Sequence, residues 1–150
     1  MIQQQRNPPA LNSAAFAVRY TAVPRRVLIV EDDLDSVRAL AELVRDIGHT
    51  VQYAINGYAA LEIARRFKPQ FVLLDLGLPG MDGYEVCSRL KHEADAEIKG
   101  ARIIALTAYG QDEHRVRARA AGCELHLVKP ISPHALFDVL ESTPAARASA

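Results

Sequence analysis

The sequence is poor in cysteine and has no long apolar run, and each absence excludes a class of protein. The two cysteines among 150 residues, Cys87 and Cys123, lie far apart and form no C-x-x-C or metal-binding spacing. We therefore expect free, buried thiols in a reducing compartment and assign them no function. No apolar run is long enough to cross a bilayer, and the apolar stretch 14–18 is too short for the core of a secretory signal. These absences favour a cytoplasmic protein that does not bind a membrane.

The charges balance overall but are unevenly distributed. The chain has 18 Lys and Arg against 18 Asp and Glu, yet residues 1–26 contain four Arg and no acid. Residues 27–141 hold 13 basic and 18 acidic side chains, a net charge of −5. This acidic excess argues against direct nucleic-acid binding by the folded part. A chain of this length, 49% hydrophobic and 24% charged, suits one globular domain.

The domain boundaries follow from where periodicity starts and stops. Residues 1–25 show no sustained pattern, so we expect a flexible basic leader with at most a marginal helix around 11–20. The ordered domain is expected to cover 26–141. Residues 142–150 are expected to form a C-terminal tail.

Five short apolar runs alternate with amphipathic stretches, which is typical of βαβ units around a parallel sheet. All runs but the second are nearly unbroken, as expected for strands covered on both faces. No G-x-G-x-x-G follows the first run, so we predict a doubly wound α/β fold. Its five-stranded parallel sheet has the flavodoxin-like order 2-1-3-4-5 and helices on both faces. The expected strands are 27–30, 51–54, 71–74, 103–106 and 125–128, and the expected helices are 34–47, 57–67, 83–93, 111–121 and 133–141.

One of these helices is expected to be held loosely. The stretch 111–121 is nearly all polar, and Val116 is its only large apolar residue. A helix is held in a protein chiefly by the apolar face that it buries. The sequence therefore predicts weak packing for this helix.

Four of the five predicted strands end in chemically reactive side chains. The first runs into Glu31-Asp32-Asp33, the third ends at Asp75, the fourth at Thr107 and the fifth at Lys129. Ligands of open α/β sheets bind at the carboxyl ends of the strands, so these groups share one crevice. Converging carboxylates repel one another unless a cation lies among them, and ligands that are all oxygen suit Mg²⁺ or Mn²⁺.

This combination is the equipment for phosphoryl transfer. A lysine pairs with a phosphate as a point charge, a threonine hydroxyl can donate to a phosphoryl oxygen, and a carboxylate can carry an aspartyl phosphate. Each residue alone has a simpler interpretation. Asp32 or Asp33 could cap the first helix, Thr107 could merely end a strand, and Lys129 could be a solvated charge. Their occurrence together at adjacent strand ends favours the phosphoryl-transfer interpretation.

The motifs that carry these residues resemble the receiver domains of bacterial response regulators over about residues 26–141. They are most similar to receivers of hybrid histidine kinases and to single-domain regulators. The resemblance implies a phosphoacceptor switch, not an enzyme, that takes a phosphoryl group from a histidine kinase or phosphotransfer protein and binds a downstream protein target. It implies no small-molecule substrate other than phosphodonors. The motifs are Val27–Asp33, Leu73–Gly83, Ala105–Ala108 and His126–Pro130.

The resemblance also implies roles for single residues around the metal. Asp75 would be the phosphoacceptor and would also contact the metal. Asp33 would be a direct metal ligand, and Asp32 would act largely through water. The Gly77 backbone carbonyl would complete the protein's share of the metal shell.

Further roles fall on the strands at the far side of the site. Thr107 would hydrogen-bond the phosphoryl group, Lys129 would pair with it, and the Lys129-Pro130 bond would be cis. His126 stands where the family usually has Tyr or Phe, at the position that reports phosphorylation to partners. We expect Thr107 and His126 to be the switch residues, with output that depends on pH, and the simpler interpretation of His126 is an ordinary exposed histidine on an edge strand. The expected docking face consists of helix 111–121, the fifth strand and the last helix.

Two other functions remain open. A metal-dependent phosphatase could use the same aspartate, but it would need a general acid and a substrate pocket, for which the sequence gives no sign. A receiver-shaped scaffold would be expected to lack Asp33, Asp75 or Lys129, and all three are present. No output domain fits in 150 residues, so we expect a single-domain regulator or a receiver cut from a longer protein.

Overall fold

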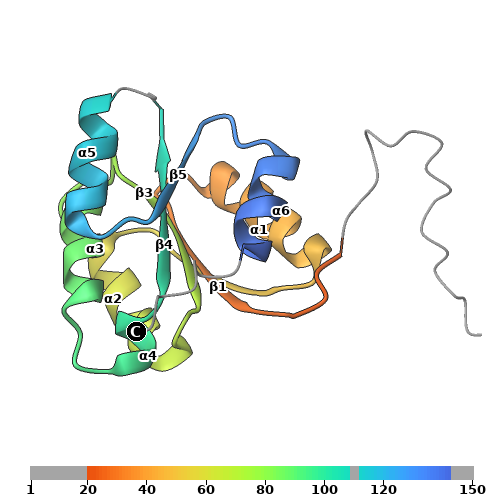
Figure 1. Cartoon of the computed structure of the whole chain (residues 1–150), viewed down its shortest axis with the longest axis horizontal. Coiled ribbons are helices and arrows are strands. Elements are labelled where there is room, and N and C mark those ends of the chain that lie inside the picture. The colour runs from red at the N-terminus through yellow and green to blue at the C-terminus, as the bar shows by residue number, and fades with distance from the viewer. Residues whose placement is uncertain (1–19, 109–111, 143–150) are drawn as a thin grey trace, which may run out of the picture.

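The computed structural model describes residues 20–108 and 112–142, which form a five-stranded parallel sheet between two layers of helices (Figure 1). The strand order β2-β1-β3-β4-β5 confirms the predicted topology. All expected strands and helices are present to within two residues. Their bounds are β1 Arg26–Val30, α1 Leu34–Ile47, β2 Thr50–Ala54, α2 Gly57–Phe67, β3 Phe71–Asp75, α3 Gly83–Lys91, α4 Ala96–Lys99, β4 Arg102–Thr107, α5 Asp112–Ala121, β5 Leu125–Val128 and α6 Pro133–Glu141.

One helix was not predicted from the sequence. α4 is a single turn in which the Asp95 side chain accepts a hydrogen bond from the Glu97 backbone N–H. Four residues are too few to show a helical period, so the pattern of apolar residues gives no signal for it.

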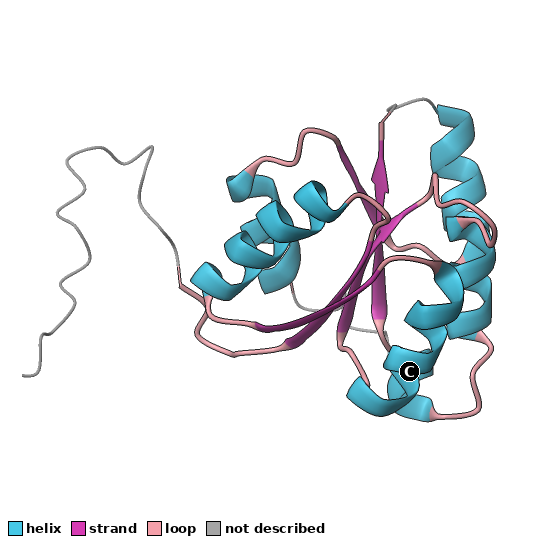
Figure 2. Ribbon diagram, turned by 180° about the vertical axis from the view of Figure 1, so that it is seen from behind, coloured by secondary structure: helices cyan, strands magenta, loops and turns pink. Residues whose placement is uncertain are grey.

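The helices cover both faces of the sheet, as expected. α1 and α6 lie on one face, and α2, α3 and α5 lie on the other (Figure 2). Side chains of a strand point alternately to the two faces. In β1, Val27 and Ile29 therefore join the core under α1 and α6, while Leu28 and Val30 join the core under α2 and α3. The side chains on both faces of each central strand are buried, which explains why the apolar runs are unbroken.

The prediction that β5 is covered on both faces is wrong. β5 is an edge strand that pairs with β4, and its Leu125 and Val128 side chains are 37% and 41% exposed. The apolar run of an edge strand reads the same as that of a central strand, because periodicity alone does not show what lies over each face. The exposure leaves apolar side chains at the surface beside α5.

Weak packing of α5 is confirmed. Ala118 is the one buried side chain among those of α5 that the structure describes, and Val116 is 69% exposed. The contacts between α5 and α3 are partly polar. Arg117 lies 4.0 Å from the ring centroid of Tyr84, and the Tyr84 hydroxyl lies 3.1 Å from Nδ1 of His114. Little apolar surface therefore holds this helix in place.

The last residues of the predicted leader contact the domain. The Thr21 backbone N–H donates to the Ile47 carbonyl at 2.7 Å, and the Arg25 backbone N–H donates to Nδ1 of His49 at 3.0 Å. Most of the predicted leader, its marginal helix up to residue 19, and residues 143–150 of the tail lie outside the described residues. Among the helices that the structure describes, none is long and apolar enough to cross a membrane.

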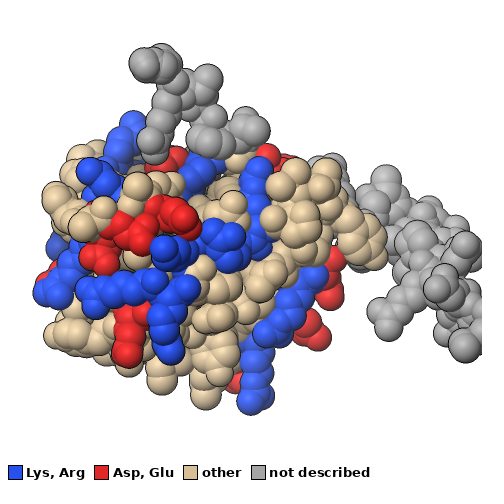
Figure 3. All heavy atoms as spheres, turned by 90° about the horizontal axis from the view of Figure 1, so that it is seen from below, with Lys and Arg blue, Asp and Glu red and all other residues tan. Residues whose placement is uncertain are grey.

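The end of the molecule where α4 lies carries charges of both signs (Figure 3). Lys68 pairs with Asp95 at 3.0 Å, and Arg102 pairs with Glu124 at 2.9 Å. Exposed ion pairs of this kind contribute about 0–1 kcal/mol each. Their main effect is to mix the signs of charge on this face.

His49, in the turn between α1 and β2, is 5% exposed and forms a buried polar contact. Because Nδ1 accepts the hydrogen bond from Arg25, this nitrogen carries no proton in the folded state. Burial lowers the pKa of His49 below its usual value of 6.5, although the Glu141 carboxylate 3.8 Å from Nε2 opposes the change. The fold therefore favours the neutral imidazole.

The buried imidazole predicts that stability falls in mild acid. Because burial lowers the pKa of His49 in the folded state, the stabilising contribution of the neutral ring is complete well above the usual pKa of 6.5 and is lost as the pH falls below it. Urea unfolding at about pH 7.5 and 5.5 should show a smaller loss of stability in His49→Asn, whose amide oxygen can still accept from Arg25. The exposed His134 provides the control, and His134→Asn should keep the wild-type loss. Equal losses in wild type and His49→Asn would contradict this explanation.

Candidate functional site

Side chains from four strand ends meet at the carboxyl edge of the sheet, as the sequence predicted. Glu31 follows β1, Asp75 ends β3, Thr107 ends β4 and Lys129 follows β5. Asp75, Thr107 and Lys129 line a common pocket of about 400 Å³. The strand order brings these groups together, because β1, β3, β4 and β5 are neighbours in the sheet.

The acidic cluster differs from the predicted set of metal ligands. Carboxylate oxygens of Glu31, Asp32 and Asp75 lie within 4.8 Å of one another. Asp33 does not belong to this group. Its Oδ2 accepts hydrogen bonds from the backbone N–H of Ser36 at 3.2 Å and from the Ser36 hydroxyl at 2.7 Å, which caps α1. In the structure Asp33 therefore caps the first helix, which is the simpler of the two roles considered for it.

Glu31 belongs to the acidic run that the sequence places at the site, but the sequence assigned it no role at the metal. It is 2% exposed and directly follows the last residue of β1, and its backbone N–H donates to the Ala54 carbonyl. The position of Glu31 in the sequence could have indicated its role, because the first acid after a buried strand lies closest to the sheet edge. The sequence shows three consecutive acids but does not show which of them turn back toward β3.

Lys129 bridges two carboxylates of the cluster. Its Nζ lies 2.9 Å from Oε2 of Glu31 and 3.4 Å from Oδ2 of Asp75. Burial raises the pKa of Glu31, and the charge of Asp75 adds to this effect, while the hydrogen bond from Lys129 opposes it. Burial alone would lower the pKa of Lys129, but its contacts with Glu31 and Asp75 outweigh burial and raise it. The lysine therefore remains charged and offsets part of the repulsion.

Asp75 is held in one orientation beside a free hydroxyl. Its Oδ1 accepts a hydrogen bond from the Gly77 backbone N–H at 2.9 Å, while Oδ2 faces Lys129. The Thr107 Oγ1 is buried and has no hydrogen-bond partner among the described residues. A buried hydroxyl without a partner is costly, so a ligand that accepts its hydrogen bond would be stabilised there. The predicted cis Lys129-Pro130 bond is confirmed.

Two further residues that the sequence did not indicate line the pocket. Tyr84 from α3 and His114 from α5 stand at its wall and are hydrogen-bonded to each other. They lie far from the strand ends in sequence and reach the pocket only through the packing of α5 on α3. Tyr109, two residues beyond Thr107, lies outside the described residues.

The first residue of α3 fixes the position of the Asp75 backbone. A Cβ at Gly83 would lie 2.6 Å from the Asp75 carbonyl oxygen and 2.6 Å from the Leu76 Cα. Both contacts are with backbone, which cannot move aside without shifting the loop after β3. Glycine thus lets α3 approach the site closely.

We expect Gly83→Ala to destabilise the fold by about 1–3 kcal/mol, because the added methyl group forces the backbone of the site apart. Urea unfolding measures this loss directly. Gly77→Ala is the matched control, since its Cβ would meet nothing closer than Asp75 Oδ1 at 3.6 Å. The control should stay within about 0.5 kcal/mol of wild type. A Gly83→Ala protein as stable as wild type would show that the loop adapts freely.

The donor set fits a hard divalent cation. Three carboxylates and one lysine leave the cluster negative, and all candidate ligands are oxygens. Mg²⁺ and Mn²⁺ prefer such ligands, and Mg²⁺ usually keeps several waters. The structure records the Gly77 N–H bond to Asp75. Metal binding by the Gly77 carbonyl remains a prediction.

A doubly wound sheet with an oriented aspartate, a paired lysine and an unpartnered hydroxyl at its carboxyl edge defines an α/β phosphoacceptor. The comparison with known families is specific on this point. Residues 27–141 match the family model of the response regulator receiver domain, and the chain belongs to this family. It is therefore a receiver domain of two-component signalling, with the phosphoacceptor role of that family.

Individual relatives agree with this assignment. The polar-differentiation response regulator DivK of Brucella anthropi is 33% identical over 120 residues, covering 80% of this chain and 96% of DivK. The transcriptional regulatory protein PdtaR of Mycobacterium tuberculosis is 40% identical over 121 residues, and this chain spans 57% of its length. The receiver domain of the sensor histidine kinase PA1611 from Pseudomonas aeruginosa was solved with a magnesium ion coordinated in the active site cleft. It is 28% identical, with a TM-score of 0.71 over 79% of this chain and 96% of that domain.

Proposed function

We propose that Asp75 accepts a phosphoryl group from a histidine kinase or a phosphotransfer protein, and that this changes the binding of a downstream protein. The observation that carries the proposal is the position of the Asp75 carboxylate. It lies 3.4 Å from the Lys129 ammonium and lines the same pocket as the unpartnered Thr107 hydroxyl. A carboxylate so placed can attack the phosphorus atom of a donor while both neighbours contact the phosphoryl oxygens.

The transfer needs little further chemistry from the chain. A carboxylate oxygen of Asp75 forms a bond to phosphorus as the phosphorus–nitrogen bond of the donor phosphohistidine breaks, and the imidazole leaves with a proton from solvent. Lys129 moves its contact to a phosphoryl oxygen, and Thr107 donates its hydroxyl hydrogen to another. Hydrolysis by water later restores the carboxylate, so the chain is a switch that assists its own phosphorylation and dephosphorylation.

We further propose that Glu31, Asp32 and Asp75 hold Mg²⁺, or Mn²⁺ in its place. Support comes from the clustering of their oxygens and from the magnesium ion in the related PA1611 receiver domain. A bound cation neutralises charge on the phosphoryl oxygens. In this assignment Asp33 caps α1 and has no metal bond.

Incubation with a small acyl phosphate and Mg²⁺, followed by intact-mass measurement, tests the proposed function. One added phosphoryl group that is lost slowly, and no addition when the cation is chelated, is the expected result. Rapid release of inorganic phosphate over many turnovers would instead support the metal-dependent phosphatase. A phosphatase needs a substrate pocket and a general acid. The structure has a pocket beside Asp75, lined by His114 and Tyr84, which the sequence did not indicate, so the measurement tests this alternative too.

We propose that the partner docks on α5, β5 and α6, with His126 among the contacts. His126 lies half-buried on the edge strand, next to the exposed Leu125. Burial and the nearby Arg115 lower the pKa of His126, so the ring is neutral at physiological pH and gains charge only in acid.

If His126 takes part in the switch, its pKa should differ between the two states. The imidazole signals can be followed by NMR from about pH 5 to 8, with and without the phosphoryl mimic beryllofluoride. The His134 ring, exposed on α6, is the internal control. The same His126 titration in both states would remove this residue from the switch.

We also propose that the chain acts in the cytoplasm and does not contact nucleic acid directly. The net charge of −5 on residues 27–141 supports the second statement, because nucleic-acid surfaces are usually basic.

A further inference from the structure

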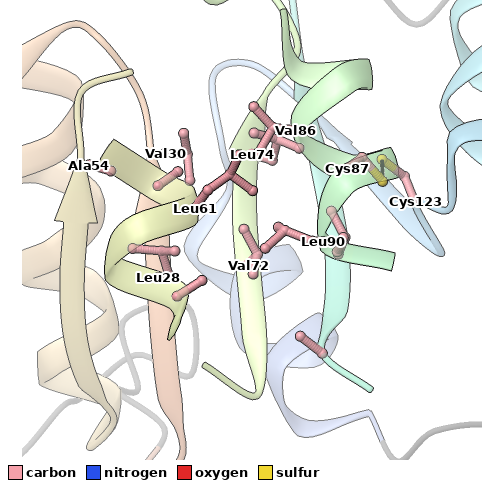
Figure 4. Packing of buried hydrophobic residues seen from close by; sticks show 14 of the residues in the cluster. Leu28, Val30, Ala54, Leu61, Val72, Leu74, Val86, Cys87, Leu90 and Cys123 are labelled. Atoms are coloured by element: carbon pink, nitrogen blue, oxygen red, sulfur yellow. Dashed lines mark hydrogen bonds between the residues drawn. The ribbon is translucent and has the colours of Figure 1, made fainter. Parts of the chain in front are cut away.

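Two thiols that are distant in sequence touch in the interior of the domain. Cys87 on α3 and Cys123 between α5 and β5 are 36 residues apart, yet their sulfur atoms lie 3.1 Å from each other (Figure 4). Both are free and buried, as expected from the sequence, with exposed fractions of 0% and 4%. The contact itself could not be expected, because neither cysteine belongs to a short motif.

The hydrogen bond between the two thiols makes them chemically unequal, and a lysine lies beside both. Lys91 lies one helical turn after Cys87 on α3, and its side chain passes over the turn at Gly122, where a Cβ would lie 2.7 Å from the Lys91 Cγ. The Cys123 thiol donates a hydrogen bond to the Cys87 sulfur. That bond and the charge of Lys91 lower the pKa of Cys87, whereas the same contact raises the pKa of Cys123. Cys87 is therefore the better nucleophile of the pair.

We propose that Cys87 and Cys123 are a redox modification site, which forms a reversible intramolecular disulfide with a peroxide and thereby fastens α5 to α3. The Cys87 thiolate attacks one peroxide oxygen, the oxygen–oxygen bond breaks, and one water leaves as a sulfenic acid forms. The Cys123 sulfur then attacks the Cys87 sulfur and a second water leaves. Two thiols and one hydrogen peroxide thus give one disulfide and two waters. The sulfurs need to approach by only about 1 Å to reach bonding distance.

The bond would act on the helix that the fold holds least firmly. Ala118 is the one buried side chain among the described side chains of α5, and the other contacts to α3 include the polar ones of Tyr84 with His114 and Arg117. Because little apolar surface must be exposed to lift α5, a peroxide can reach the thiols by local opening. Once formed, the disulfide opposes that opening. This device is independent of the phosphorylation of Asp75.

Intact-mass measurement of the full chain after treatment with hydrogen peroxide tests the modification. The expected product is a monomer that has lost the mass of two hydrogens, resists alkylation by N-ethylmaleimide after denaturation, and regains both thiols with dithiothreitol. In Cys123→Ser the crosslink should be absent, and dimedone should trap a sulfenic acid at Cys87. Two alkylatable thiols after treatment, a sulfinic acid without crosslink, or a crosslink that joins two chains would each overturn the proposal. The wild-type measurement decides the matter even if the variant folds poorly.

Amide hydrogen exchange tests the mechanical consequence. Exchange in α5 should slow by about tenfold or more in the oxidised chain, since the bond removes the opened states, while α1 should exchange as before. Unchanged exchange in α5 of a fully oxidised sample would show that the disulfide does not fasten the helix.

Discussion

Asp75→Asn is expected to take up no phosphoryl group from a small acyl phosphate or from a phosphorylated histidine donor. An amide oxygen is a poor nucleophile. Among the residues that the structure describes, Glu31 is the remaining carboxylate paired with Lys129, and its Oε2 is already bonded to the lysine Nζ at 2.9 Å. The fold should persist, because the Asn side-chain oxygen can still accept the hydrogen bond from the Gly77 N–H. Intact mass after incubation with Mg²⁺ measures the loss, which should reach the background of the method.

Asp82→Asn is the matched control for this loss. Asp82 lies in the same loop region and caps α3, where its Oδ1 accepts a hydrogen bond from the Glu85 N–H at 2.9 Å. An Asn can serve as such a cap, so this variant should be labelled as the wild type is. Labelling of a well-folded Asp75→Asn protein would show that another residue is the acceptor, and peptide mapping would then identify it.

The second large effect is expected in cation binding and separates two adjacent aspartates. Asp32→Ala should weaken Mg²⁺ binding by at least about tenfold, because it removes a carboxylate from the cluster with Glu31 and Asp75. Asp33→Ala should leave Mg²⁺ affinity within about twofold but should destabilise α1 by about 1 kcal/mol through loss of its cap. Calorimetric titration with Mg²⁺ and urea unfolding measure the two quantities.

This pair of variants tests the structure against the resemblance. The resemblance to receiver domains makes Asp33 the direct ligand and predicts the opposite order of the two affinities. If Asp33→Ala abolishes Mg²⁺ binding and Asp32→Ala does not, the Asp33 side chain must leave its capping position when the cation binds. Equal losses in both variants would contradict both assignments of roles.

The sheet could be predicted in detail because its signals are local. Each central strand is buried on both faces, so its apolar residues form an unbroken run, and the stretch before Gly48 shows the helical period of α1 together with its stop. The exposure of the β5 side chains and the single turn of α4 depend on what packs nearby, and the spacing of apolar residues in the sequence does not record that.

The candidate site could be predicted to the level of strand ends. Asp75, Thr107 and Lys129 follow apolar runs directly, so the topology alone brings them together. The choice among three consecutive acids depends on how the backbone turns after Val30. The wall made by Tyr84 and His114, and the contact of the two sulfurs, arise from the docking of α5, which few apolar residues direct.

The outer edge of β5 bears on the solubility of the domain. An exposed apolar edge strand is a template on which another chain can add a strand, and this is a common start of aggregation. β5 has four residues, and the sequence after it continues with Lys129 and Pro130. A short edge offers few backbone groups, and proline has no N–H to donate. The short length of β5 and the proline that follows it therefore help to keep neighbouring molecules from joining their sheets edge to edge.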